Sequence, residues 1–251
     1  MRIVGTIEAR MGSSRLPGKT LMEVREGKPL LELVVSRFRM SSGIDDVYVA
    51  TTAEKGDDPI AQWCEKNGVH YHRGSEEDVL ERVTETALKA GADAIVQMGA
   101  DSAYLYYELV GRLVEVYKEG VYDYVCNDLE LTFPLGIYAH VVRVSRLVEL
   151  NRRSDLSEND REDVVRYIFE HPAEYAINNL VAPPEFAFPE LRFTIDYPED
   201  MQLVRQIVQR LGDRFNTLQL LELHRQEPAL FEKTKGLVQL SAPFLRKCAN
   251  A

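Results

Sequence analysis

Residues 3–19 of the chain read Ile-Val-Gly-Thr-Ile-Glu-Ala-Arg-Met-Gly-Ser-Ser-Arg-Leu-Pro-Gly-Lys. The stretch starts as an apolar run and then changes abruptly to small and polar residues that include Arg10, Arg15 and Lys19. This pattern predicts a buried strand followed by a basic loop. Small residues let main-chain N–H groups approach phosphate oxygens, and the cations offset the phosphate charge. We therefore expect the loop to bind a polyphosphate, the alternative being a solvated turn with incidental charges.

The composition limits the classes of protein to consider. The 251 residues are 45% hydrophobic and 28% charged, as in an ordinary globular protein with a sizeable core. A net charge of −10 argues against a general nucleic-acid-binding protein, because phosphate backbones require basic surface. No apolar run is long enough to span a membrane. Cys64, Cys126 and Cys248 are scattered without a zinc-type or disulfide pattern, so we expect a cytoplasmic protein.

Beyond the basic loop, predicted strands and helices alternate. Apolar strands are expected at 2–8, 47–51, 69–72, 94–98 and 122–126, and helices begin near Pro29, Pro59, Ser75 and Tyr107. This alternation implies βαβ crossovers and a mostly parallel sheet with helices on both faces. Ligands of such sheets lie at the carboxyl ends of the strands, so the loops at 9–19, 51–58 and 99–104 should face one side. Within them, Asp57 and Asp58 are interpreted as a solvated turn.

The second half of the chain is less regular. A longer strand or hairpin arm is expected at 133–144, interrupted by Gly136, and helices at 146–152 and 159–170. Strands at 175–181 and 191–195 precede a strongly amphipathic helix that opens at 196–200. No linker is long enough to separate independent domains. We therefore predict a single domain over residues 1–251, in which 130–185 forms an excursion.

Two acidic residues follow predicted strands. Asp101 comes after the strand at 94–98, and Asp196 follows 191–195. Mg²⁺ prefers one or two carboxylates together with phosphate oxygens and water. Beside a phosphate-type loop, these two residues predict a metal–triphosphate site. The alternatives are a turn residue at Asp101 and a helix N-cap at Asp196.

The stretch at 3–19 resembles the N-terminal signature of the cytidylyltransferases that make CMP-activated sugars. It is closest to the spore-coat polysaccharide biosynthesis (SpsF-type) branch, whose pattern reads I-Q-A-R-M-G-S-S/T-R-L-P-G-K. Similar blocks stand at 49–52, 73–82, 161–168 and 191–200, so the likeness covers most of residues 2–210. The resemblance implies a three-layer α/β/α fold of the Rossmann-like, GT-A-like nucleotidyltransferase kind. It also implies a homodimer to which the excursion contributes.

The resemblance also implies an activity: Mg²⁺-dependent transfer of CMP from CTP to a sugar or related acidic acceptor, with release of pyrophosphate, in cell-surface polysaccharide synthesis. Carried over by position, the catalytic residues would be Arg10, Lys19, Asp101 and His140. Asp101 and Asp196 would hold the metal. The CTP-binding positions would be Ala9, Arg10, Gly12, Ser13, Ser14, Arg15, Lys19, Thr51 and Gln97, with Ala9 and Thr51 near the cytidine.

The chain departs from the family pattern on the acceptor side. Relatives carry C-P-L-I-D-P, G-L-D-V-E-V and V-R-I-T-A-D, whereas this chain has Tyr106, Tyr138, His140 and Gln97 at charged positions of those motifs. One hypothesis is a different, more negatively charged acceptor, with His140 as a contact or base. The alternative is that His140 is a hydrogen-bonded interface residue.

Two other functions stay open at this point. A nucleotide-sugar-dependent glycosyltransferase would need a DxD-like pair after a strand, which the sequence Asp101-Ser102-Ala103 lacks. A nucleotide-binding homologue that has lost acceptor-side catalysis would explain the missing charged residues.

Overall fold

The computed structural model describes residues 1–237, and Cys248 lies outside them. Within these residues, a seven-stranded sheet has the order β5-β4-β1-β6-β8-β7-β9. Its strands are β1 (Ile3–Ala9), β4 (Asp46–Thr52), β5 (His70–Gly74), β6 (Ala94–Gly99), β7 (Tyr124–Cys126), β8 (His140–Arg143) and β9 (Ile177–Asn179). Neighbouring strands are parallel except where β8 pairs with β6 and β7. The predicted, mostly parallel sheet is therefore confirmed.

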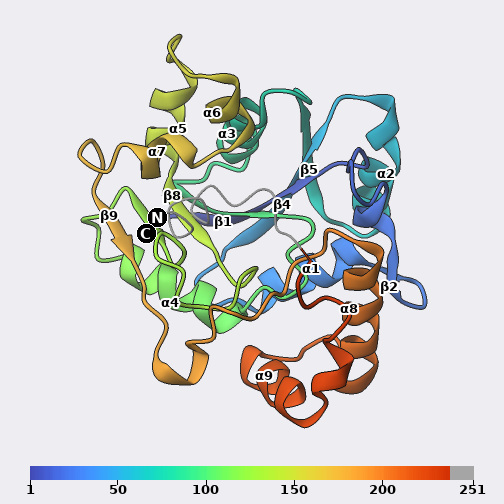
Figure 1. The fold of residues 1–251 in the computed structure, drawn as a ribbon. Coiled ribbons are helices and arrows are strands. Elements are labelled where there is room, and N and C mark those ends of the chain that lie inside the picture. The colour runs from blue at the N-terminus through green and yellow to red at the C-terminus, as the bar shows by residue number, and fades with distance from the viewer. Residues whose placement is uncertain (238–251) are drawn as a thin grey trace.

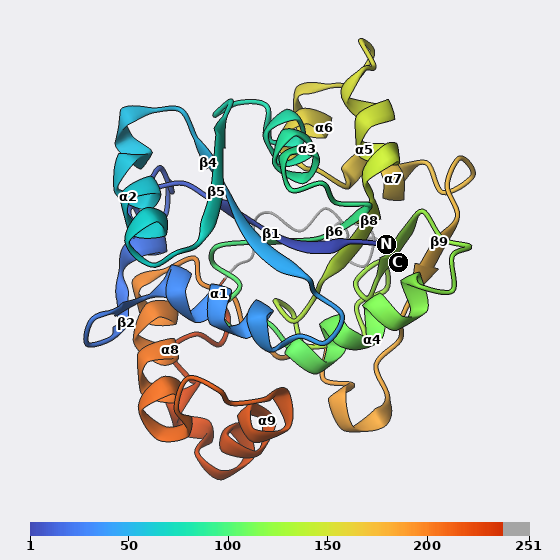
Figure 2. The same cartoon turned by 180° about the vertical axis from the view of Figure 1, so that it is seen from behind.

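Helices cover both faces of the sheet (Figures 1 and 2). One face carries α1 (Leu30–Met40), α4 (Tyr107–Tyr117), α8 (Pro198–Leu211) and α9 (Thr217–Gln226), and α2 (Asp58–Lys66) lies near the β5 edge. The other face carries α3 (Val79–Lys89), α5 (Val144–Asn151), α6 (Glu158–Glu162) and α7 (Arg166–Glu170). Smaller elements are the hairpin β2 (Glu23–Arg25) and β3 (Lys28–Pro29) and the 3-10 turns η1 (Lys19–Leu21), η2 (Lys55–Asp57), η3 (Pro184–Phe186) and η4 (Pro228–Leu230). The three-layer prediction is confirmed.

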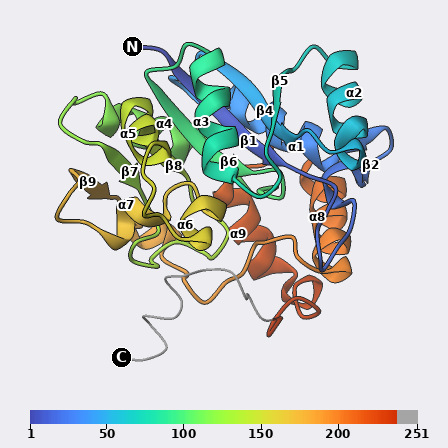
Figure 3. The ribbon, with the colours of Figure 1, turned by 90° about the horizontal axis from the view of Figure 1, so that it is seen from above.

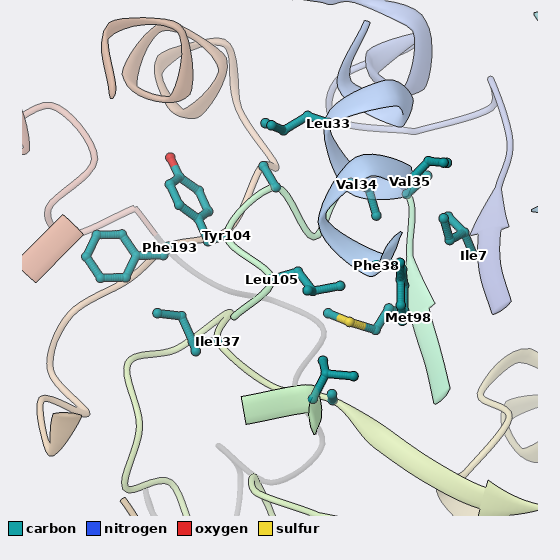
Figure 4. Packing of buried hydrophobic residues seen from close by; sticks show 14 of the residues in the cluster. Ile7, Leu33, Val34, Val35, Phe38, Met98, Tyr104, Leu105, Ile137 and Phe193 are labelled. Carbon is teal, nitrogen blue, oxygen red and sulfur yellow. The ribbon is translucent and has the colours of Figure 1, made fainter. Parts of the chain in front are cut away.

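The two faces of the sheet bury separate apolar clusters because side chains alternate along each strand. On the α1 side, Ile7 of β1 and Met98 of β6 belong to the same cluster as Phe38 and Tyr104 (Figure 4). On the α3 side, Ile95 and Val142 belong to a second cluster together with helix residues such as Val83. Burial of this apolar surface is the main favourable term that holds the helices on the sheet.

One buried cation ties the α1 layer together. The Arg37 side chain is fully buried and donates to the carbonyl oxygens of Leu105, Asp213 and Phe215, at 2.8–3.1 Å. Its guanidinium also lies 4.1 Å from the Phe215 ring centroid. The α1 helix is thereby joined to the loop after β6 and to the segment between α8 and α9.

Three predicted elements differ from the structure. The helix expected at 159–170 is two short helices, because Asp163 adopts an extended backbone between α6 and α7. The arm expected at 133–144 is a strand only over β8, which runs antiparallel in the sheet. The strand expected at 191–195 is a single bridge from Arg192 to Leu135.

The segment 130–185 contributes β8 to the interior of the sheet and β9 to its edge. Figure 3 shows α6, α7 and β9 grouped on the opposite side of the molecule from α2. Among residues 1–237, no helix combines the length and apolar character needed to cross a membrane.

Candidate functional site

The loops after β1, β4 and β6 meet at one edge of the sheet, as predicted. Ala9, the last residue of β1, is in register with Thr51 of β4, and Glu8 is in register with Gly99 of β6. Ala9 and Thr51 are both buried, and the Thr51 hydroxyl is a buried group without a hydrogen-bond partner. An unpaired buried hydroxyl is costly in a folded protein. Its presence here is consistent with a site that a ligand completes.

The basic loop after β1 is held by Asp57, which the sequence analysis interprets as part of a solvated turn. Asp57 is only 4% exposed and accepts a 2.7 Å hydrogen bond from the Met11 N–H through one carboxylate oxygen. Its other oxygen is bonded to the Thr52 hydroxyl. The interpretation of Asp57 as a solvated turn is therefore wrong. The position of Asp57 just past the end of β4, on the ligand side of the sheet, is the signal that pointed to this role.

The remaining residues of the loop form a tight turn with an open rim. The N–H groups of Ser13 and Gly18 both donate to the Met11 carbonyl oxygen, each at 2.9 Å. Arg10, Gly12 and Ser14 are exposed. Arg10 is thus placed at the edge of the loop, where a ligand can reach it.

The structure brings the basic loop and the two predicted metal ligands together. Lys19 Nζ lies 2.5 Å from Asp101 Oδ2 and 3.9 Å from Asp196 Oδ1, and it donates to the Ile195 carbonyl oxygen at 2.7 Å. Arg15 Nη2 lies 2.6 Å from the same Asp196 oxygen. Two cations and two carboxylates from distant parts of the sequence therefore form one cluster.

Asp196 is positioned by neighbours that sequence reasoning missed. Arg192 makes a paired contact with Asp200, at 2.6 and 2.9 Å, and contacts Asp196 at 3.3 Å. Asp200 also accepts from the Asp196 N–H at 2.8 Å. The signal was present in the block 191–200, where one arginine and two aspartates, Arg192, Asp196 and Asp200, stand close together in the sequence.

A glycine fixes the segment that leads to Asp196. Leu135 exchanges backbone hydrogen bonds with Leu191 and Phe193, at 2.8 and 2.7 Å. Gly136 follows with a φ of +93°, and a Cβ there would lie 2.1 Å from the Phe193 carbonyl oxygen. Only glycine accommodates both the backbone conformation and the close approach.

The cluster suits a divalent cation bound together with phosphates. The Asp101 and Asp196 carboxylates already converge on one positive charge, the Lys19 ammonium. Arg15 Nη1 is a buried donor without a hydrogen-bond partner, which a phosphate oxygen can satisfy. Among residues 1–237, no group of three or more His, Cys, Asp or Glu side chains could hold a metal ion. Further ligands would therefore come from phosphate oxygens and water, as Mg²⁺ prefers.

Gln97 and His140 belong to a second polar group on the α3 side of the sheet. His140 Nδ1 lies 3.0 Å from Gln97 Oε1, and His140 Nε2 lies 2.9 Å from Asp128 Oδ2. Gln97 Nε2 donates to Glu8 Oε1. Both ring nitrogens of His140 are thus engaged by protein groups. Sequence reasoning did not connect Glu8 and Asp128 with His140, because their contacts depend on the register of three strands.

The pKa values in this group are shifted in ways that follow from its burial. Burial raises the pKa of Glu8 to about 7, against the hydrogen bond from Gln97, which lowers it. Burial lowers the pKa of His140, but the Asp128 carboxylate, together with Asp163 and Glu8, raises it, and the net pKa is raised. Burial also raises the pKa of Asp163. Clusters of shifted pKa values of this kind are typical of functional sites.

Tyr106, Tyr138 and His140, which stand at charged positions of the family motifs, do not all lie in one place. The Tyr138 ring stacks on the His140 ring with centroids 5.3 Å apart. Tyr106 instead packs against Phe186, with ring centroids 5.1 Å apart. Tyr138 and His140 therefore belong to the second polar group, whereas Tyr106 belongs to the apolar packing of the other face.

Comparison with known proteins identifies relatives over most of the chain. A family model described as cytidylyltransferase matches residues 4–246. Spore coat polysaccharide biosynthesis protein SpsF of Bacillus subtilis (strain 168) is 34% identical over 216 residues, covering 84% of this chain and 88% of that protein. The 3-deoxy-manno-octulosonate cytidylyltransferase of Escherichia coli is 24% identical over 255 residues, covering 94% and 96% of the two chains. A solved cytidylyltransferase from Leptospira borgpetersenii serovar Hardjo-bovis (strain JB197) has a TM-score of 0.86 at 26% identity, covering 95% of this chain and 99% of that chain.

Proposed function

The chain belongs to the cytidylyltransferase family and is a nucleotidyltransferase; we propose that it transfers CMP from CTP to a sugar or a related acidic acceptor and releases pyrophosphate. The observation that carries this proposal is the cluster in which Arg15 and Lys19 meet Asp101 and Asp196. Such a set of charges suits a metal-bound triphosphate. The relatives in polysaccharide and octulosonate chemistry support a role in cell-surface polysaccharide synthesis.

Each part of the cluster has a distinct task in this proposal. Arg10, Arg15 and Lys19 bind the triphosphate. The backbone N–H groups of Gly12 and Ser14 approach its oxygens, while the Ser13 N–H stays bonded to the Met11 carbonyl oxygen. Asp101 and Asp196 hold Mg²⁺, which, when bound, neutralises negative charge on the phosphates. The contribution of these residues is to position the α-phosphate and to stabilise the charge of the transition state.

The nucleotide base lies, in this proposal, over the ends of β1 and β4. Ala9 gives it a small neighbour, and the buried Thr51 hydroxyl supplies a polar group that has no protein partner. Gln97 of β6 lies on the α3 face of the sheet, hydrogen-bonded to both Glu8 and His140. The acceptor would approach from that polar side.

A homodimer and a cytoplasmic location are further parts of the proposal. The excursion 130–185 exposes Val181, which is 59% accessible and next to the β9 edge of the sheet. An open sheet edge with apolar neighbours is suited to pairing with a second copy. Light scattering after size-exclusion chromatography measures the mass directly, and a monomer across the micromolar range would refute the dimer.

Pyrophosphate release tests the reaction. The purified protein is incubated with Mg²⁺, CTP and one acceptor at a time, starting from 3-deoxy-manno-octulosonate and including neutral sugars. We expect pyrophosphate and a CMP-linked product with at least one acidic sugar, and loss of both in Lys19→Met. CTP binding without turnover on any acceptor would instead favour a binding protein. Transfer of a sugar from a nucleoside diphosphate sugar would favour a glycosyltransferase.

A further inference from the structure

Three neighbouring strands carry a continuous line of polar side chains across the α3 face of the sheet. Gln97 of β6 is in register with His140 of β8, and Glu8 of β1 is in register with Gly99, two residues along β6. Asp128 follows β7 and is 5% exposed, as buried as His140 at 6%. The hydrogen bonds run from Glu8 through Gln97 and His140 to Asp128.

The donors and acceptors of this line determine where its protons lie. An ionised carboxylate can only accept, so the amide nitrogen of Gln97 faces Glu8 and its oxygen faces His140. His140 Nδ1 must then carry a proton to donate to that oxygen. Nε2 must carry one to donate to Asp128. This arrangement therefore contains a doubly protonated His140 between two acceptors and an ionised Glu8 at the far end.

Glu8 is the member of the line that lies nearest the edge of the sheet where the loops after β1, β4 and β6 meet. It is partly exposed, stands two residues before Arg10, and accepts from the Ala100 N–H through its carbonyl oxygen. The charged groups that face its carboxylate are Arg82 of α3, Asp163 from the turn between α6 and α7, and Asp101 after β6. Arg82 is 2% exposed and its Nε has no hydrogen-bond partner.

We propose that Glu8 is the base that accepts the proton of the acceptor hydroxyl, and that Asp128, His140 and Gln97 are positioning residues that keep Glu8 ionised and oriented. The proposal rests on the cytidylyl transfer inferred above. Glu8 takes the hydroxyl proton while the acceptor oxygen forms a bond to the α-phosphorus of CTP. The bond from that phosphorus to the bridging oxygen breaks, and pyrophosphate leaves with the electron pair. Glu8 then releases the proton to water.

The position of His140 excludes it from the role of base in this arrangement, because neither ring nitrogen is free. A pKa of about 7 suits Glu8 for proton exchange near neutral pH. The raised pKa of His140 agrees with a ring that stays protonated beside Asp128. With Glu8 ionised, the hydrogen bonds of the line place a proton on each ring nitrogen of His140.

NMR titrations against pH test the line. They follow the side-chain ¹³C signal of Glu8, assigned by its loss in Glu8→Gln, and the ring ¹⁵N signals of His140. Asp128→Asn removes one negative charge and, by releasing the second ring proton, one positive charge. The net charge near Glu8 is therefore unchanged. Gln97 is then free to turn and accept from a protonated Glu8, so we expect the pKa of Glu8 to rise by about one unit.

Gln97→Leu is the control that separates transmission through the Gln97 amide from a general structural effect of Asp128→Asn. Without the amide, Asp128→Asn should leave the Glu8 pKa unchanged, because the connection between the two carboxylates is cut. An unchanged Glu8 pKa after Asp128→Asn in the wild-type background would overturn the positioning role. So would a shift that persists in the Gln97→Leu background.

The base role is tested by turnover with an acceptor that the wild-type protein uses. We expect Glu8→Gln to lower kcat about 100-fold or more while the Kd for CTP changes less than about threefold. Glu119→Gln, an exposed change in the turn that follows α4, should leave both values unaltered. A Glu8→Gln protein that turns over like wild type refutes the base and leaves the proposed function standing. An inactive wild-type protein refutes the function and the base together.

Discussion

The most informative single change is Asp196→Asn, because Asp196 joins the N-terminal loop to the second half of the chain. Its side chain is 5% exposed and lies 2.6 Å from Arg15, 3.3 Å from Arg192 and 3.9 Å from Lys19. The amide has nearly the same shape as the carboxylate. The substitution therefore removes one negative charge from among three cations and changes the packing little.

The cost follows from what each cation retains. Removing one partner of a buried ion pair costs about 3–5 kcal/mol. Here Arg192 keeps its paired contact with Asp200 and Lys19 keeps Asp101. Arg15, with a side chain 25% exposed, regains some hydration. We expect the free energy of unfolding to fall by about 2–3 kcal/mol, which corresponds to a Tm lowered by about 4–12 °C in a chain of this size.

Urea unfolding followed by the fluorescence of Trp63, the single tryptophan, measures this change. Asp155→Asn is the matched control, because Asp155 pairs with Arg153 in an exposed position and its loss should not move the urea midpoint. An Asp196→Asn protein that unfolds at the wild-type urea concentration, with the same m-value, would contradict the expected loss of stability. It would mean that the cluster does not couple the two halves of the chain.

Three further changes have defined outcomes in the same unfolding assay. Gly136→Ala forces a Cβ to within 2.1 Å of the Phe193 carbonyl oxygen at a φ of +93°, and should cost about 3 kcal/mol or more; Gly56→Ala, which meets open space, should stay within about 0.5 kcal/mol. Arg37→Met leaves three backbone carbonyls, two of them buried, without their donor, and should cost about 3 kcal/mol or more. Because the pKa of Glu8 is raised from 4.5 to about 7 in the folded state, its contribution to stability is present below pH 4.5 and lost as the pH rises through 7. Glu8→Gln should therefore flatten the pH dependence of stability across that window, and an unchanged slope would contradict the shifted pKa.

Local pattern was enough to predict most of the fold. The apolar runs at 2–8, 47–51 and 94–98 are short, and a predicted helix follows each of them, so the pattern predicted a parallel sheet with helices on both faces. The same logic placed Asp101 at the carboxyl edge of the sheet. The basic loop was recognisable because its cations stand among small residues, a local property that survives without any tertiary information.

What could not be predicted depends on contacts between distant segments. The antiparallel insertion of β8 is set by pairing with β6 and β7, and nothing in the residues around His140 specifies that neighbour. The predicted helix at 159–170 has a continuous helical pattern, yet Asp163 breaks it by taking an extended backbone. The connection from Glu8 to Asp128 exists only once three strands are in register.

In the proposed reaction, the cluster of Arg15, Lys19, Asp101 and Asp196 binds CTP together with Mg²⁺. Isothermal titration calorimetry of CTP into the wild-type protein, with Mg²⁺ and with EDTA in its place, tests this claim without knowledge of the acceptor. We predict saturable binding that weakens about tenfold or more without Mg²⁺ and about 10- to 100-fold in Lys19→Met. Absence of CTP binding, or binding that is indifferent to both Mg²⁺ and Lys19→Met, would contradict it.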